Sequence, residues 1–138
     1  MKTIKNTLLT LLCATTLISC SKDDKTANID FPVQRFDRKI TFKVMGEYSG
    51  TLNVSYANPT SEYGVTPGEV LTTIPWQKDL DYNRQVKLTA LALSGQNGQP
   101  NETVQIQVFS NGELIETEFG IADEQGRLNS ETSTIYFK

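Results

Sequence analysis

Two glutamates, Glu116 and Glu118, stand two residues apart in a segment that alternates like a strand. A strand rises by about 3.3 Å per residue, so their Cα atoms would lie roughly 7 Å apart on one face. That separation suits the carboxylate pair of an inverting glycosidase. The flanking Ile115, Thr117 and Phe119 form the more apolar side of the segment, which favours a solvated outer face for the two acids. We therefore expect no catalytic residue in this pair.

Nucleophilic catalysis finds no support in the rest of the composition. The chain has no histidine, which removes histidine-based triads, histidine metal sites and histidine acid–base catalysis. Its two cysteines, Cys13 and Cys20, both lie near the N-terminus, and no serine stands in a Gly-x-Ser-x-Gly turn. We expect a protein that is not an enzyme and that carries no cofactor.

Two further acidic groups, Asp79 with Asp81 and Asp123 with Glu124, offer oxygen ligands of the kind that calcium takes. Neither has a third acid at a fixed spacing or the loop pattern of an EF-hand, so we expect solvated loops and no metal site.

The single tryptophan, Trp76, follows Pro75 and stands close to Tyr82. Such a group can stack on sugars or apolar ligands, but one tryptophan on an early strand of a sandwich is more often at the centre of the core. The second interpretation predicts six residues pointing inward together: Phe42, Val44, Trp76, Leu88, Ile106 and Phe119.

Cys20 carries the clearest chemical signal. Lys2 and Lys5 precede an apolar stretch that is too short for a membrane span of roughly 20 residues and has the build of a secretory signal. The stretch ends in Leu17-Ile18-Ser19-Cys20, which resembles a bacterial lipobox. We expect removal of residues 1–19 and acylation of Cys20 by chains such as palmitate, which would anchor the protein in a membrane.

The residues that follow Cys20 indicate where in the cell envelope the protein is located. Ser21 follows Cys20, a pattern typical of outer-membrane sorting, and the Lys-Asp-Asp run at 22–24 resembles the surface export signal of Bacteroidetes-type lipoproteins. We expect a lipid anchor in the outer membrane with display at the cell surface; a plain solvated linker is the alternative. Removal of Lys2 and Lys5 leaves 11 basic and 16 acidic residues, a net charge of −5, which disfavours a nucleic-acid partner.

Period-two alternation dominates from residue 38 onward. Residues 40–45 and 52–56 are expected to form a hairpin around the glycines at 46 and 50, and Asn111-Gly112 predicts a second hairpin, because both turn positions need positive φ. Pro75 favours an edge or a bulge between two short strands at 70–74 and 76–80. Residues 84–93 predict a central strand, with Val86, Leu88, Ala90 and Ala92 on one face. A last strand is expected at 132–137.

No segment has a helical period, and about seven strands fall within about 100 residues. We therefore expect an all-β, antiparallel β-sandwich of immunoglobulin-like type. The expected organisation is a signal peptide at 1–19, a lipidated cysteine with a flexible tether at 20–36, and a sandwich domain at 37–138.

Three stretches, taken in order, resemble the extracytoplasmic domain of the mycobacterial small membrane protein (MmpS) family. They are Phe42-Lys43-Val44-Met45-Gly46, then Val54-Ser55-Tyr56 with Ile74-Pro75-Trp76, then residues 104–108 leading into Asn111-Gly112. The resemblance implies a small β-sandwich that assists an exporter of lipids or small molecules. The chain departs from the family in having a lipobox where members have a transmembrane helix, and in lacking their C-terminal cysteine pair.

These features predict a cell-envelope lipoprotein whose sandwich binds a partner, such as an envelope transporter or another surface complex. An adhesin or glycan-binding module is the alternative, and a minor hydrolase is the third class. Loops carry most binding sites, so we expect the contact surface in the loop at 58–68 and at the edge near Pro75. Its candidate residues are Glu62, Tyr63 and Tyr82.

Overall fold

The computed structural model of the chain describes residues 33–62 and 64–138. Within these ranges the chain forms eleven strands and no helix, so the all-β class is confirmed. No described segment is therefore a helix long and apolar enough to cross a membrane. The expected signal peptide, Cys20 and most of the expected tether lie outside the described residues, as does Tyr63.

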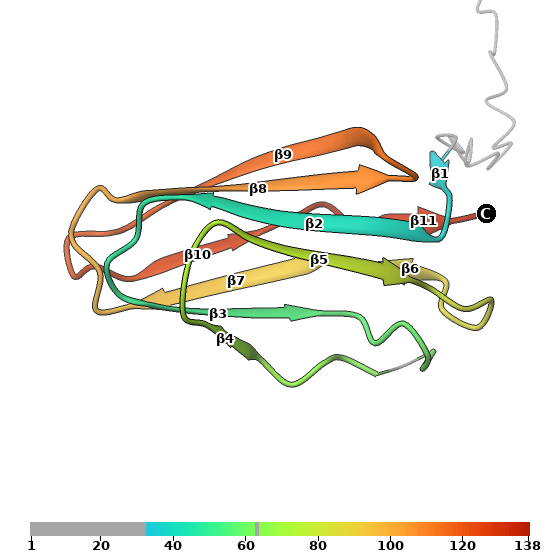
Figure 1. Cartoon of the computed structure of the whole chain (residues 1–138), viewed down its shortest axis with the longest axis horizontal. Helices are drawn as coiled ribbons and strands as arrows, with labels where there is room; N and C mark the ends of the chain where they lie inside the picture. The colour runs from blue at the N-terminus through green and yellow to red at the C-terminus, as the bar shows by residue number, and fades with distance from the viewer. Residues whose placement is uncertain (1–32, 63) are drawn as a thin grey trace, which may run out of the picture. The chain divides into compact units, whose positions relative to one another are not determined.

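Two four-stranded antiparallel sheets form the body of the domain, stacked face to face in Figure 1. In spatial order, the first sheet contains β5 (Trp76–Asp81), β2 (Lys39–Gly46), β8 (Thr103–Ser110) and β9 (Glu113–Ile121). The second contains β10 (Leu128–Glu131), β7 (Leu91–Gln96), β3 (Thr51–Tyr56) and β4 (Glu69–Leu71). A third, small sheet consists of β1 (Arg35–Phe36), β11 (Ile135–Phe137) and β6 (Leu88–Thr89), in which β1 runs parallel to β11.

The core lies between the two large sheets, because alternate residues of each long strand point inward. The ring of Phe42 on β2 lies 6.2 Å from that of Tyr56 on β3, which joins the two sheets across the core. The most deeply buried strand residues, each at most 1% exposed, are Ile40, Phe42, Val44, Val54, Thr89, Leu91, Val104, Ile106, Val108 and Leu128. An antiparallel sandwich-like arrangement is thereby confirmed.

The first predicted hairpin is wrong. β2 and β3 belong to different sheets, and residues 46–50 cross from one sheet to the other. Five residues can reach across the roughly 10 Å between packed sheets. Tyr48 stabilises this crossover, since its hydroxyl donates to the Gly126 carbonyl at 2.7 Å.

The predicted strand at 84–93 is interrupted at Ala90, between β6 and β7. Val86 is buried as expected, but the chain at 82–87 is not a strand, so the alternation restarts and Thr89, Leu91 and Leu93 point inward. Leu88 is consequently 44% exposed instead of lying in the core. β7 lies between β10 and β3, so the central placement expected for its residues is confirmed.

The second predicted hairpin is confirmed. Asn111 (φ 50°) and Gly112 (φ 88°) form the turn between β8 and β9, and glycine tolerates this backbone without a Cβ clash. A register shift follows: Phe109 pairs with Leu114, but Val108 pairs with Glu116, so Ile115 is an extra residue. One inserted residue reverses every side chain beyond it. Phe119 is therefore 64% exposed, which corrects its expected place in the core.

The number of strands also differs from the expected seven, because short strands carry little sequence signal. β1 lies within the expected tether, so the folded part begins by Arg35. β5 is an edge strand, as Pro75 predicted. Trp76 is half-buried and packs against the core from this edge, while Phe42, Val44 and Ile106 are fully buried as expected.

Candidate functional site

Tyr82 is a core residue, which corrects its assignment to a binding surface. It is 2% exposed, its ring lies 4.9 Å from that of Phe137, and its hydroxyl is 2.7 Å from the Thr89 hydroxyl. Burial raises the pKa of Tyr82 to about 12, a shift that the hydrogen bond with Thr89 only partly offsets. Its role is to pack beneath the small third sheet.

Glu62 is exposed in the loop that follows β3, and Tyr63 beside it lies outside the described residues. The Asn58 amide donates to the Gly64 carbonyl at 2.7 Å, and the Asn83 side chain donates to the Thr60 carbonyl at 3.0 Å. The loop is thus held against the segment after β5. Glu62 remains a candidate contact residue, but it does not form a common surface with Tyr82, which is buried.

Glu116 and Glu118 lie on the inner side of β9, because they pair with Val108 and Ile106, whose side chains point into the core. Both are half-buried, and a Glu116 carboxylate oxygen accepts from the Ser133 amide at 2.6 Å. The expected outer, solvated face is therefore wrong for these two acids. Glu116 instead ties the margin of the first sheet to the chain just after β10.

The remaining acidic groups hold local structure. Asp79 accepts from the Thr41 hydroxyl at 2.6 Å, and this bond, followed by the one from Gln77, lowers the pKa of Asp79. Asp123 accepts from the Arg127 amide at 2.8 Å, which lowers its pKa and closes the turn before β10. In the described ranges, no group of three or more His, Cys, Asp or Glu is arranged to hold a metal ion.

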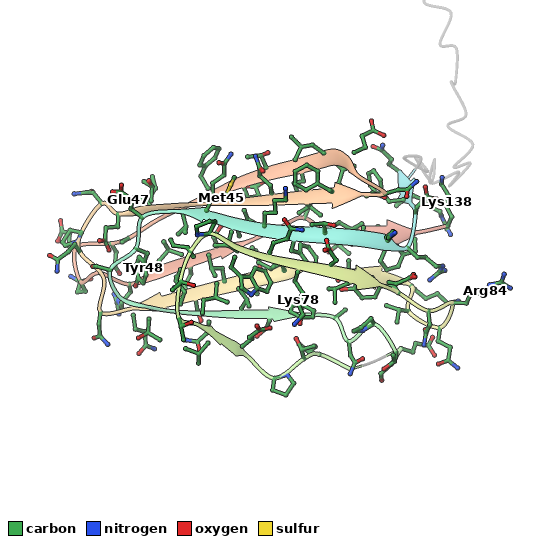
Figure 2. All side chains as sticks on the ribbon, in the orientation of Figure 1. Met45, Glu47, Tyr48, Lys78, Arg84 and Lys138 are labelled. Carbon is green, nitrogen blue, oxygen red and sulfur yellow. The ribbon has the colours of Figure 1, made fainter. Side chains whose placement is uncertain are left out.

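Trp76 belongs to a small polar cluster at the β4–β5 edge. Its indole nitrogen donates to Glu69 at 3.4 Å. Lys78, which is labelled in Figure 2, pairs with the same carboxylate at 3.5 Å. Tyr56 and Glu69 together raise the pKa of Lys78. The cluster links β5 of the first sheet to β4 of the second, so Trp76 has a structural partner for its polar atom.

The outer face of the first sheet carries an apolar patch that the sequence pattern did not predict. The patch consists of Leu114, Phe119 and Ile121 on β9, with exposed fractions of 48%, 64% and 64%. Phe109 on β8 pairs with Leu114 and carries the Lys43 ammonium 4.7 Å above its ring. Phe119 and Ile121 are neighbours on the outer face of β9, whereas Thr117 separates them from Leu114, and adjoining exposed apolar side chains mark interaction surfaces more often than single ones do.

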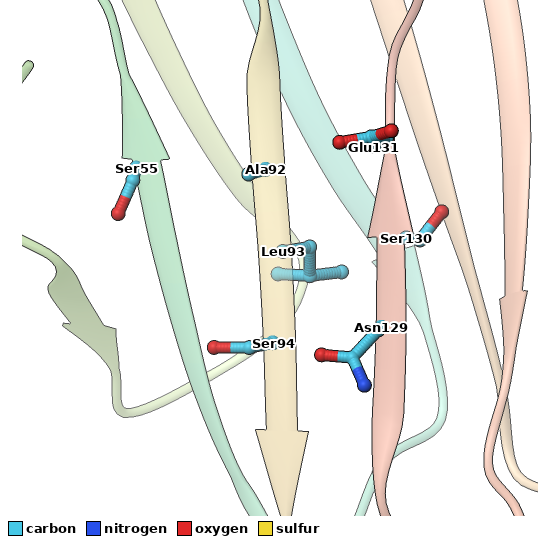
Figure 3. Close-up of a pocket in the computed structure, with 7 residues that line it drawn as sticks. All are labelled: Ser55, Ala92, Leu93, Ser94, Asn129, Ser130 and Glu131. Carbon is cyan, nitrogen blue, oxygen red and sulfur yellow. The ribbon is translucent and has the colours of Figure 1, made fainter.

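The outer face of the second sheet is hollow instead. A depression of about 440 Å³ lies over β7, with Ser55 on β3 at one side and Asn129 and Glu131 on β10 at the other (Figure 3). Its small residues Ala92 and Ser94 leave the space open. A second depression of about 220 Å³ shares Ser55, Ala92 and Glu131 and adds an apolar wall made of Ala57, Val65, Leu88 and Ala90.

Neither surface was predicted from the sequence as a binding surface, and Phe119 and Leu88 were expected in the core. The patch was hidden because its side chains depend on the register shift opposite Phe109. The hollow had a usable signal, since Ala92 and Ser94 alternate with Leu91 and Leu93 and are small where an outer face usually carries long side chains.

Comparison with protein-family models, with curated protein sequences and with solved structures finds no match to this chain.

Proposed function

We propose that the chain is an outer-membrane lipoprotein, anchored through acylated Cys20, whose sandwich domain binds a partner protein of the cell envelope without catalysing a reaction. The lipobox supports the anchor, and Ser21 with the Lys-Asp-Asp run at 22–24 supports surface display. The observation that carries the binding role is the patch of Leu114, Phe119 and Ile121 on the outer face of β9. A multi-subunit transport complex is the partner class that the resemblance to the MmpS family favours.

The immunoglobulin-like character of the sandwich belongs to the same proposal. Seven strands have four or more residues, four of them in the first sheet and three in the second, a division like that of immunoglobulin constant domains. Such a domain on a tether of about fifteen residues can reach about 20–25 Å from its anchor. Attachment to one membrane raises the local concentration of a partner, so a small interface is sufficient.

Cross-linking in intact envelopes tests the binding role. The double variant Phe119→Ser/Ile121→Ser should lose about nine-tenths of the cross-linked product, since exposed apolar side chains dominate small interfaces. The matched control is Val70→Ser/Leu88→Ser, which removes two exposed apolar side chains from other elements and should keep the product. Equal yields from the two variants would contradict the proposed surface.

Labelling with palmitate tests the anchor separately. The wild type should incorporate the label and Cys20→Ala should not, while protease added to whole cells should degrade the wild type if the domain is displayed outside. An unlabelled wild-type protein with an intact Met1 would end the lipoprotein proposal.

A glycan-binding role is the second candidate, and the hollow on the second sheet supports it. Hydroxyl, amide and carboxylate groups of Ser55, Asn129 and Glu131 stand beside an apolar wall that includes Leu88. Sugars need this combination, because their rings have polar edges and apolar faces. A glycan array that responds to the wild type, and loses its response in Asn129→Ala, would favour this role.

A further inference from the structure

The edges of the two large sheets are not equally protected. Three of them are short or carry features that discourage pairing: β4 has three residues, β10 has four, and β5 has six residues with Pro75 before it and charges along it. β9 has nine residues and lies at the margin of its sheet beyond β8 (Figure 1). It is the longest edge strand in the part of the chain that the structure describes.

The backbone of β9 is unpaired on the side away from β8, while β10 packs against the inner face of β9 at Gly120, beside Leu128 and Ser130. β9 pairs with β8 alone, and no backbone hydrogen bond from its residues to another element is found within the described ranges. The Ser133 amide approaches only the side chain of Glu116. A row of unpaired N–H and C=O groups on a long edge is the feature that accepts an added strand.

The charges on the strands of this edge are of one sign, although Arg35 and Lys138 lie near Glu113 and Ile115 at its turn end. β9 contains Glu113, Glu116 and Glu118, β10 contains Glu131, and β8, β9 and β10 contain no lysine or arginine. Glu116 and Glu118 point to the inner side of the sheet, whereas Phe119 and Ile121 point to the outer side. An incoming strand therefore meets carboxylates on one of its faces and apolar side chains on the other.

A second copy of the chain fits this edge poorly when the two β9 strands overlap over their full length. In an antiparallel pair of β9 strands centred on Thr117, Glu116 of one copy faces Glu118 of the other, and like charges directly opposite each other repel. A strand with lysine or arginine at those positions, and apolar residues at the alternate ones, satisfies both faces at once.

We infer that the partner docks by adding an extended segment to β9, and that this segment alternates basic residues, which face Glu116 and Glu118, with apolar residues, which face Phe119 and Ile121. This inference rests on the proposed partner-binding function and names the chemistry of the partner. Backbone hydrogen bonds to β9 give the affinity, and the two glutamates give the selectivity.

Binding of three capped nonapeptides to the full-length protein, purified in detergent, tests this inference. One alternates lysine and valine, one alternates glutamate and valine, and one is the lysine peptide with methylated backbone nitrogens. By fluorescence anisotropy in low salt, the lysine peptide should bind at least about tenfold tighter than either of the others, and the difference from the glutamate peptide should shrink as salt is raised. The lysine peptide should also slow hydrogen exchange of β9 amides.

Charge reversal provides the matched variants. Glu116→Lys/Glu118→Lys should reverse the preference toward the glutamate peptide, and Glu118→Lys alone, which keeps the contact between Glu116 and Ser133, should abolish the preference. The control Asp79→Lys/Asp81→Lys makes the same change at the same spacing on edge strand β5 and should retain wild-type preference.

Each contrary result has a definite meaning. Equal binding of lysine and glutamate peptides, equal binding of the methylated peptide, or dimerisation of the protein through β9 would overturn strand addition by a basic segment. If peptides fail to bind while Phe119→Ser/Ile121→Ser still loses its envelope cross-link, the partner uses the outer face of β9, and only the present inference is wrong. If peptides bind but the cross-link is unaffected, the proposed function fails instead.

Discussion

The outer faces of the two large sheets differ far more than their inner faces do. On both inner faces, every second residue of a long strand is aliphatic or aromatic, and these side chains pack into one core. Outside, the first sheet presents the large side chains of Phe119 and Ile121, whereas the second presents Ala92 and Ser94 beneath an open hollow. Of two successive residues in a strand, only the one that points inward is constrained by the core. The one that points outward is available for function. One small sandwich can thereby carry two surfaces of opposite character.

The largest expected effect comes from the part that both faces share. Phe42 is fully buried and its ring packs near Tyr56 of the opposite sheet. Phe42→Ala should lower the free energy of unfolding by about 3–5 kcal/mol, a large share of the roughly 5–15 kcal/mol typical of a domain. Urea denaturation measures the change. Phe119→Ala, an aromatic truncation on the exposed face, should cost less than about 1 kcal/mol, and similar costs for both would mean that Phe119 is not exposed.

The second prediction separates the two faces. Ala92→Phe should close the hollow over β7 without disturbing the core, because Ala92 is exposed. Any glycan binding should fall by at least about tenfold, whereas the envelope cross-link through β9 should keep its wild-type yield. The free energy of unfolding should stay within about 0.5 kcal/mol of wild type. Loss of the cross-link in a folded Ala92→Phe variant would show that the faces do not act separately.

A third prediction concerns the patch itself. Phe119→Ser/Ile121→Ser should change the midpoint of urea unfolding little, since both side chains are 64% exposed. The same variant should bind fewer molecules of a dye that fluoresces on exposed apolar surface, and it should leave the hollow's ligands unaffected. A marked loss of stability would indicate that the patch is covered within the protein.

Local signals in the sequence predicted local structure well. The Asn111-Gly112 turn needs only its own two residues, and the alternation of Phe42 with Val44 needs only their strand. The pairing of strands distant in sequence was not predictable in this way. β2 pairs with β5 and β8 instead of with β3, and this pairing depends on the packing of the whole core.

The same distinction explains the errors at the candidate sites. Simple alternation from the Asn111-Gly112 turn places Phe119 inward and Glu116 outward, and the extra residue Ile115 reverses both. Tyr82 was assigned to the contact surface because it stands near Trp76 and the edge at Pro75, yet its hydroxyl is paired with the buried Thr89 hydroxyl, seven residues later. A bulge and a tertiary hydrogen bond are each set by contacts that a single segment does not contain.

The smallest expected effect concerns the end of the sandwich where the chain passes between the sheets. Glu102 lies in the connection from β7 of the second sheet to β8 of the first, and it accepts from the Ser49 amide in the 46–50 crossover at 3.0 Å and from the Gln99 amide at 2.8 Å. These bonds, that from Ser49 first, lower the pKa of Glu102 below its usual value. Asp123, in the connection from β9 to β10, likewise has a pKa below its usual value.

A carboxyl group whose pKa is lower in the folded state binds fewer protons there than in the unfolded chain. Its stabilisation is complete above the usual pKa, about 4.3 for glutamate, and is lost as the pH falls through the lowered folded value. Urea midpoints should therefore drop between about pH 5 and pH 3, and Glu102→Gln should drop less, because its side chain has no proton to gain. Since Glu102 joins two crossovers between the sheets, acid should weaken both outer faces together. If the urea midpoint of Glu102→Gln drops as far as that of the wild type, the acid sensitivity belongs to other carboxyl groups. The contacts of Glu102 would then have no measurable part in holding the two sheets together.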